Sequence, residues 1–448
     1  MYKVGIIGAG ICGLSTATTL HKNQIEFKIF ESSNEPGGCI KTFYEFNSII
    51  ETGPNSINGR NEDINDLINY LSIESECYYS NEKSKNRYIL KNNKALAVPV
   101  SPNQIVKNKI LSISTKLKII NEMLIKSKSN SNESLEEFIL RRFDQEFLDY
   151  IINPFVNGIY AGNPSKLIVS KAFPKLIEME KKYGSIVKGF INARNLKKSK
   201  NKLNDRRVFT FKNGLQTLPL KMVEHFRDKI KYNHRVQEVN QHDKKIWSID
   251  NESFSHLVFT QPAYTFDNLK SPLDLSFLKD IYYSPVTTVN LLYDRKQFKK
   301  DIDGFGILVP DCENKFILGV LFPSIIFPNR CPNNKILLTV FVGGAIHPDR
   351  ALLNQDDLIK NIESDLSDFL NLEGHSEHFK IVRWEKAIPQ YETNINDVHK
   401  QIERIENEQK NIFFGGNYIG GISLSNAIST GKNIGEKIVK DVKKRKVF

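Results

Sequence analysis

Apolar residues at the start of the chain occur first in strand patterns and then at helical spacing. Residues 2–7 form a short apolar run and residues 26–30 alternate, as strands do, whereas residues 14–22 have the period of a helix. The segment 8–13 between the first strand and the helix is rich in glycine, which predicts a tight turn. The chain therefore begins with a strand, turn, helix and strand in that order.

Helical spacing returns in the middle of the chain. From about residue 105 to residue 126, apolar side chains recur every three or four positions with lysines between them. Ser134 and Glu137 have the spacing of a capping box, which predicts a further helix over residues 135–150. We therefore expect residues 101–205 to form a helical insertion.

Most of the remaining chain has strand patterns, and the fold class expected is α/β. The predicted strands are 208–211, 236–239, 246–249, 256–260, 287–293 and 336–342. Residues 411–439 repeat the order of strand, glycine turn and helix. No apolar run approaches the roughly 18 to 20 residues that a membrane-spanning helix needs.

Composition and charge narrow the classes of protein. The chain has 448 residues, of which 40% are hydrophobic, and a formal net charge of +12, a composition that excludes disordered and collagen-like proteins. Residues 101–205 hold 19 basic and 10 acidic residues, so +9 of the charge is local. No nucleic-acid recognition motif accompanies it. Five cysteines without a C-x-x-C pair indicate neither a disulfide framework nor a zinc site, and favour the cytoplasm.

The opening turn has the spacing of a dinucleotide-binding motif. Gly8 permits the turn, Gly10 lets the backbone approach a pyrophosphate, and Gly13 allows the helix and strand to pack closely. Glu31, at the end of the second strand, can accept hydrogen bonds from a ribose. A merely packed glycine turn with a surface glutamate is the less favoured alternative.

Further candidate residues lie in glycine turns and on one strand. The turns are 37–38, 53–56, 158–162 and 415–421, and each alone is more often a loop than a site. Arg87 lies on a strand-like segment, where an arginine either faces solvent or holds a substrate carboxylate. The histidines show no metal-ligand pattern, and His375 and His378 are most simply read as a solvated loop.

These motifs and several longer stretches resemble the FAD-dependent protoporphyrinogen and coproporphyrinogen oxidases, within the amine-oxidase-like flavoproteins. The resemblance runs nearly end to end. The stretches that carry it are 133–143, 154–167, 172–176, 183–185, 304–310, 318–322, 341–344, 388–391 and 416–418.

The resemblance implies a Rossmann-like FAD-binding domain of discontinuous segments, a mixed-sheet substrate domain and a helical membrane-associating insertion. The FAD-binding domain would comprise 1–85, 206–262 and 405–448, the substrate domain 86–100 and 263–404, and the insertion 101–205. Basic residues among apolar helical faces in the insertion favour an anionic membrane surface, and a solvated lysine-rich face is the alternative.

The resemblance also implies which residues form the site, and it implies neither a catalytic acid or base nor a metal. The expected FAD-binding residues are Gly8, Ala9, Gly10, Ile11, Cys12, Gly13, Glu31, Ser32, Gly38, Cys39, Gly53, Pro54, Asn55, Ser56, Val236, Gly420, Gly421 and Ile422. The expected substrate-binding residues are Arg87, Gly162, Leu308, Leu321 and Phe341.

The implied reaction is the six-electron oxidation of protoporphyrinogen IX to protoporphyrin IX in heme biosynthesis, with dioxygen or another compound as electron acceptor. Coproporphyrinogen III oxidation is the nearest alternative, and a non-redox binding protein on the same fold is a more distant one. The expected location is the cytoplasm, peripherally on the inner face of the cell membrane, and a homodimer is a further expectation.

Overall fold

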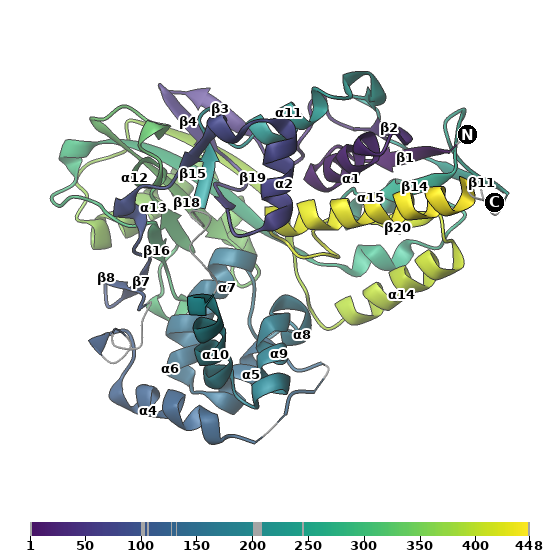
Figure 1. Cartoon of the computed structure of the whole chain (residues 1–448). Helices are drawn as coiled ribbons and strands as arrows, with labels where there is room; N and C mark the ends of the chain where they lie inside the picture. The colour runs from purple at the N-terminus through teal and green to yellow at the C-terminus, as the bar shows by residue number, and fades with distance from the viewer. Residues whose placement is uncertain are drawn as a thin grey trace.

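The computed structural model describes residues 2–99, 104, 107–126, 128–130, 132–199, 208–243 and 246–446. A five-stranded sheet forms one end of the molecule, and its neighbouring strands are all parallel (Figure 1). Its order is β10 (Ile230–Lys231), β2 (Glu26–Phe30), β1 (Lys3–Ile7), β14 (His256–Phe259) and β20 (Ile412–Phe414). Helices α1 (Ile11–Lys22) and α15 (Leu424–Lys446) pack against each other beside this sheet. The predicted opening unit and the repeated pattern near the C-terminus are therefore confirmed.

A mixed seven-stranded sheet forms the second part, and only its β16–β7 pair is parallel among its described pairs. Its order is β19 (His378–Pro389), β15 (Tyr283–Asp294), β18 (Lys335–Gly343), β17 (Gly319–Leu321), β16 (Gly306–Leu308), β7 (Tyr88–Lys91) and β8 (Lys94–Ala97). Helix α13 (Gln355–Leu370) covers one face through a cluster of buried apolar side chains. The predicted strands 287–293 and 336–342 lie within β15 and β18.

The described elements of the third part, which lies below the two sheets in Figure 1, are helices. They are α4 (Ile113–Asn121), α5 (Leu135–Arg142), α6 (Gln145–Phe147), a π-helix, η4 (Leu148–Ile152), α7 (Asn153–Tyr160), α8 (Val169–Ala172), α9 (Pro174–Tyr183) and α10 (Ile186–Ser199). Within the described residues, we find no helix whose length and hydropathy would let it cross a bilayer.

Smaller elements complete the fold around the sheets. The strands are β3 (Thr42–Glu45), β4 (Ser48–Glu51), β5 (Ile57–Asn58), β6 (Cys77–Tyr79), β9 (Val208–Phe211), β11 (Val239–Asp243), β12 (Ile246–Ile249) and β13 (Glu252–Phe254). The helices are α2 (Glu62–Leu71), α11 (Thr217–Val223), α12 (Pro323–Ile326) and α14 (Ile395–Glu408). The strands predicted over 208–211 and 246–249 have the bounds of β9 and β12.

Three predicted elements differ from the structure, each for a local reason. The helix predicted from about residue 105 to residue 126 is interrupted: the described residues 104 and 107 are helical, residues 108–112 are not, and α4 begins after Ser112, whose side chain accepts a hydrogen bond from the Thr115 amide. Residues 105 and 106 lie outside the described residues. The helix predicted over 135–150 ends at Arg142, because Asp144 caps a new helical turn. The strand predicted over 236–239 begins only at Val239, which pairs with Ile249.

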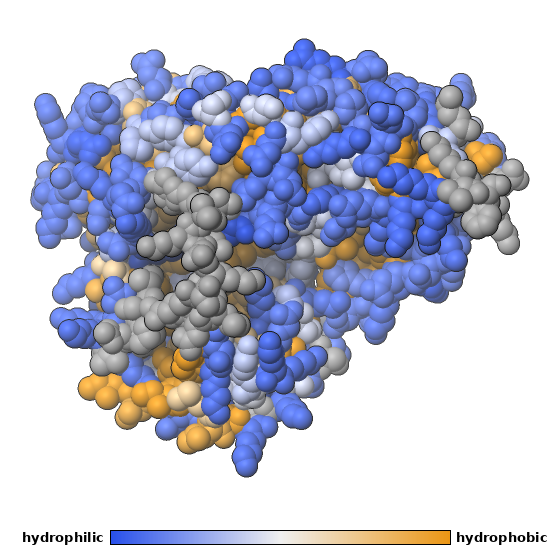
Figure 2. All heavy atoms as spheres, in the orientation of Figure 1, coloured by the Kyte–Doolittle hydropathy of each residue, from blue (hydrophilic) through white to orange (hydrophobic). Residues whose placement is uncertain are grey.

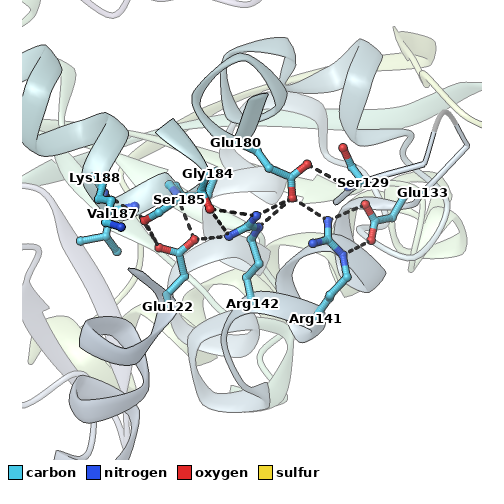
Figure 3. Close-up of polar contacts among 11 residues, drawn as sticks. Glu122, Ser129, Glu133, Arg141, Arg142, Glu180, Gly184, Ser185, Val187 and Lys188 are labelled. Carbon is cyan, nitrogen blue, oxygen red and sulfur yellow. Dashed lines mark hydrogen bonds and ion pairs between the residues drawn. The ribbon is translucent and has the colours of Figure 1, made fainter. Parts of the chain in front are cut away.

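A network of buried charges holds the helical part together (Figure 3). Arg142, at the end of α5, is fully buried between Glu122 and Glu180, with nitrogen-to-oxygen distances of 2.5 and 2.7 Å. Glu122 also accepts hydrogen bonds from the amides of Ile186 and Val187 at the start of α10. The segment of Glu122, α5, α9 and the start of α10 are therefore joined through Arg142 and Glu122.

Candidate active site

The glycine turn between β1 and α1 lies at the carboxyl end of the parallel sheet. Gly8 has a φ of +104°, which is accessible mainly to glycine, and a Cβ on Gly13 would lie 2.1 Å from the Gly8 carbonyl oxygen. A Cβ on Gly10 would meet nothing within 4 Å, so open space lies beside this residue. The turn therefore has the close helix packing and the exposed backbone that a pyrophosphate site needs.

Glu31 lies directly across from this turn and organises the backbone around it. Its Oε2 accepts a hydrogen bond of 2.6 Å from the Ala9 amide, and its Oε1 accepts from the Ser33 amide at 2.8 Å. The neighbouring Ser32 hydroxyl also contacts Oε1, at 3.3 Å. Because each carboxylate oxygen has two lone pairs, Oε2 can accept a further hydrogen bond from a ribose hydroxyl.

Two more predicted segments meet the turn from outside the first unit. The Gly37 amide donates to the Ala9 carbonyl, and a Cβ on Gly38 would lie 3.5 Å from the Gly10 Cα. Cys39 follows, and a Cβ on Gly53 would lie 2.0 Å from its carbonyl oxygen, so the 53–56 turn packs onto the second glycine pair. Both predicted segments therefore lie next to the opening glycine turn.

The C-terminal glycine loop, 415–421, closes the same site from the other side. The Gly415 amide donates to the Phe259 carbonyl at the end of β14, and a Cβ on Gly415 would lie 2.8 Å from the Cys12 sulfur. Burial raises the pKa of the Cys12 thiol to about 12, so this group beside the turn stays uncharged. Gly421 has a φ of +105°, which a larger side chain would rarely adopt.

The remaining FAD-site predictions fall beside these segments. Val236 is buried in the same cluster as Phe30, and the His234 amide just before it donates to the Glu31 carbonyl. Pro54, Asn55 and Ser56 are partly exposed, as is Ile422, whereas Gly420 is exposed.

These residues fit an FAD molecule on several independent points. The N-terminus of α1 has no side-chain cap, so its first amides are available to phosphate oxygens in the open space beside Gly10. Glu31 offers a carboxylate acceptor beside the turn, and the segments around residues 38 and 53 pack next to the same turn. FAD binding in this fold follows the rule that ligands bind outside the carboxyl ends of parallel strands.

A row of half-exposed apolar side chains lies on the face of the seven-stranded sheet opposite α13. Gly319 on β17 pairs with Leu308 on β16 and with Phe341 on β18. Leu321 lies two residues after Gly319 on β17, so its side chain points to the same face of the sheet as those of Leu308 and Phe341. Helix α7 passes close to this row, because a Cβ on Gly158 would lie 2.7 Å from the Leu308 side chain. Three of the five predicted substrate residues thus share one apolar face.

The 53–56 turn is tied to that same face. Phe341 pairs with Thr288 on β15, and the Thr288 hydroxyl donates to the carbonyl of Thr52 at 3.1 Å. Trp384 on β19 donates to this carbonyl through its indole nitrogen, at 3.0 Å. The FAD-side turn and the apolar row therefore adjoin each other through direct hydrogen bonds.

Arg87 and Gly162 lie at two borders of the row. Arg87 precedes β7 by one residue, at the level of Gly306, and its guanidinium carbon lies 4.7 Å from the centre of the Phe305 ring. Among the described residues, no carboxylate forms an ion pair with this exposed arginine. Gly162 follows Ala161, which belongs to the apolar cluster that contacts Phe341.

Comparison with known proteins agrees with this site. A sequence profile described as flavin containing amine oxidoreductase matches residues 11–438. The fold is shared with a solved Exiguobacterium structure, described as a candidate protoporphyrinogen oxidase, at a TM-score of 0.81 and 20% identity over 98% of this chain and 99% of that one. Putrescine oxidase has the fold too, at a TM-score of 0.71 and 14% identity over 98% and 99%. The chain belongs to the flavin-containing amine oxidoreductases, and its cofactor is FAD.

Within this class, the curated relatives compared with this chain are porphyrinogen oxidases. "Protoporphyrinogen oxidase, mitochondrial" from Nicotiana tabacum is 32% identical over 98% of this chain and 94% of that protein. "Coproporphyrinogen III oxidase" from Staphylococcus aureus is 26% identical over 98% and 99%. The chain is therefore a member of the protoporphyrinogen and coproporphyrinogen oxidase family.

Sequence reasoning missed the residues that join the two halves of the site. Thr52, Trp384 and Tyr391 were not predicted as site residues, although Tyr391 ends one of the stretches that carry the family resemblance. The Tyr391 hydroxyl donates to the Asn417 carbonyl at 2.6 Å and accepts from the Gly421 amide at 3.0 Å. Its position directly before the predicted 53–56 turn was the one feature of the sequence that could have marked Thr52 as a site residue.

Proposed function

We propose that this protein oxidises protoporphyrinogen IX to protoporphyrin IX as a step of heme biosynthesis. The reaction removes six electrons and six hydrogens from the macrocycle. With dioxygen as the acceptor, three molecules of dioxygen are reduced to three molecules of hydrogen peroxide. FAD supplies the redox chemistry when bound, by accepting electrons in pairs. The protein's own task is to hold one carbon of the macrocycle toward that cofactor.

The observation that carries the proposal is the apolar row beside the FAD-side turn, bordered by Arg87, which forms no ion pair within the described part of the chain. A porphyrinogen has a broad apolar body and carboxylates on its propionate arms. Leu308, Leu321 and Phe341 would contact the body, with Gly162 at the edge of the pocket. Arg87 would bind a propionate, since a guanidinium group forms two parallel hydrogen bonds to a carboxylate. The proposal assigns no acid or base residue.

Replacement of Arg87 tests the substrate assignment. Arg87→Ala should raise the KM for protoporphyrinogen IX by about tenfold or more, because a charge-assisted hydrogen bond is lost, and should leave FAD bound. Steady-state kinetics with protoporphyrinogen IX and coproporphyrinogen III measure this, with Arg404→Ala, an exposed arginine on α14, as the control. Unchanged kinetics with both substrates would overturn the role of Arg87, and a preference for coproporphyrinogen III would overturn the substrate.

The helical part carries a surface suited to a membrane, and we propose that it docks peripherally on the cytoplasmic leaflet. Ile113 and Leu124 of the α4 segment are each 77% exposed, and Leu117 and Ile120 are more than half exposed. Figure 2 shows these apolar residues gathered over α4. Lysines lie around them, so apolar insertion and attraction to anionic lipid would act together.

Co-sedimentation with lipid vesicles tests this docking. The protein should bind vesicles of phosphatidylcholine mixed with phosphatidylglycerol, and bind less to phosphatidylcholine alone or at high salt. Combined replacement of Ile113, Leu117 and Leu124 by serine should abolish binding. The matched control replaces Leu220 and Leu352, exposed leucines elsewhere on the surface, by serine. Equal binding by both variants would contradict the proposal.

A further inference from the structure

Two loops on the FAD side are fastened to the same edge of the seven-stranded sheet. Strand β19 ends the strand order of this sheet, and Trp384 on it donates to the Thr52 carbonyl just before the 53–56 turn. Tyr391, two residues beyond the end of β19, contacts the C-terminal glycine loop. One strand and its extension therefore reach both loops that lie between the parallel sheet and the apolar row.

The contact of Tyr391 with the loop has an unusual form. Its hydroxyl donates to the Asn417 carbonyl and accepts from the Gly421 amide, so one buried group joins two points four residues apart in the loop. His399 of α14 adds a third contact to this loop, 2.8 Å from its Nε2 to the Tyr418 carbonyl oxygen. Side chains from outside the parallel sheet therefore help to hold the loop, in addition to the hydrogen bond from the Gly415 amide to the Phe259 carbonyl of β14.

The ring of Tyr391 is held firmly by its own surroundings. Tyr391 is 2% exposed, and its ring packs edge-on against Tyr160 of α7 at 5.9 Å between centroids. It also packs against His399 at 6.2 Å. Because two neighbouring rings and its burial hold the Tyr391 ring, its hydroxyl can hold the loop in a defined position.

Trp384 holds the other loop, the 53–56 turn, in a similar way. Its indole nitrogen and the Thr288 hydroxyl donate to the same Thr52 carbonyl oxygen, and Thr288 is the register partner of Phe341. Strand β15, which carries Thr288, therefore connects the 53–56 turn directly to the strand of Phe341. A shift of β19 would move both loops relative to that row.

We propose that Trp384 and Tyr391 are positioning residues that set the FAD-binding loops against the substrate face. The proposal rests on the proposed function, because it takes these loops to hold FAD and this face to bind the porphyrinogen. Neither side chain needs to touch the reacting atoms. Their effect is on geometry, and a misplacement of about 1 Å can lower a rate by about 100-fold.

The variants Tyr391→Phe and Trp384→Phe test this, since each keeps an aromatic ring and loses the hydrogen bonds. In Tyr391→Phe, we expect FAD to dissociate about tenfold faster, and kcat for porphyrinogen to fall about tenfold while KM stays within about twofold. The visible circular dichroism of bound FAD should change as well. Trp384→Phe should lower kcat and change the dichroism with a smaller effect on FAD dissociation.

Tyr293→Phe is the matched control. Tyr293 is a fully buried tyrosine on β15 that donates to Glu363, on the face of the sheet covered by α13. It should lower the thermal midpoint without changing FAD dissociation, kcat or the dichroism. The proposed positioning role of Tyr391 is overturned if Tyr391→Phe matches the wild type, or matches Tyr293→Phe, in FAD dissociation, kcat and dichroism. If the wild type oxidises neither porphyrinogen, the proposed function fails, while FAD dissociation and dichroism still decide the role of Tyr391.

Discussion

Around the parallel sheet, elements approach one another at glycines, whereas in the helical part they approach one another around buried charges. A Cβ on Gly431 of α15 would lie 2.1 Å from the Cys12 carbonyl oxygen of α1, and one on Gly435 would lie 2.6 Å from the Thr19 side chain. In the helical part, the side chains of Arg142 and Glu122 are both 0% exposed. In the first region the elements approach closely because glycine has no side chain at the contact, and in the second the contacts are made by buried ions.

The difference follows from what each region presents to its surroundings. The parallel sheet must bring backbone amides within reach of a phosphate, so close packing of bare backbone serves it directly. The helical part turns its apolar residues on α4 outward and has fewer left to bury. Hydrogen-bonded ions fix how its helices are oriented, at the expense of desolvating them. Replacing one residue of the buried ion network and one glycine of the α1–α15 contact tests these two kinds of packing separately.

The largest expected effect is on the buried ion network. Arg142→Met leaves Glu122 and Glu180 buried without their shared cation, which should lower the free energy of unfolding by about 3–5 kcal/mol. Urea denaturation of the holoprotein measures this. Arg404→Met is the control, because Arg404 is 68% exposed in its pair with Glu408 and its replacement should cost at most about 1 kcal/mol. Equal losses from the two variants would show that burial of the ions does not matter.

A smaller effect is expected where α15 crosses α1. Gly431→Ala places a methyl group on a backbone carbonyl, and overpacking should lower the free energy of unfolding by about 1–3 kcal/mol despite the better helix propensity of alanine. Gly10→Ala is the control, because its methyl would enter open space at an ordinary φ of −67°. That variant should keep its stability without cofactor and bind FAD at least tenfold more weakly, as isothermal titration can show. A loss of stability in Gly10→Ala would contradict the assignment of that space to a ligand.

The smallest effect is a pH dependence confined to the helical part. Burial alone would raise the pKa of Glu180, but hydrogen bonds from Ser129, Arg142 and Arg141 outweigh it and lower the pKa to about 2. Its stabilising contribution is therefore complete above its ordinary pKa of 4.5 and is lost as the pH falls toward 2, by at most about 1.4 kcal/mol per pH unit. Urea denaturation of the wild type and of Glu180→Gln from pH 7 to pH 3 measures this. The gap between the two proteins should narrow only below about pH 4.5, and a constant gap would contradict the assigned pKa.

The sequence predicted the parallel-sheet region well because its determinants are local. The strand period of residues 26–30 and the spacing of Gly8, Gly10 and Gly13 each depend on neighbouring residues, and the structure has the predicted unit. Of the seven-stranded sheet, only β15 and β18 were predicted as strands and the segment of β7 as strand-like, and the register that brings Leu308 and Phe341 onto one face depends on pairings across the chain.

The helical part was harder to predict for a physical reason. Helical periodicity does not distinguish a buried apolar face from one that faces outward, as Ile110, which is buried, and Ile113, which is exposed, illustrate. The caps at Ser112 and Asp144 are local, and long-range hydrogen bonds from the Ser112 amide and the Thr115 hydroxyl to Glu146 add to the first of them. The pairing of Arg142 with Glu122 and Glu180 has no signature in sequence spacing.

The most direct test of the account mixes the purified FAD-containing protein anaerobically with protoporphyrinogen IX or with coproporphyrinogen III. Loss of flavin absorbance and the appearance of porphyrin fluorescence are followed together. The account predicts that protoporphyrinogen IX bleaches the flavin rapidly and forms porphyrin, faster than coproporphyrinogen III does, and that admitted air restores the flavin spectrum. A flavin that stays oxidised with both porphyrinogens would contradict it.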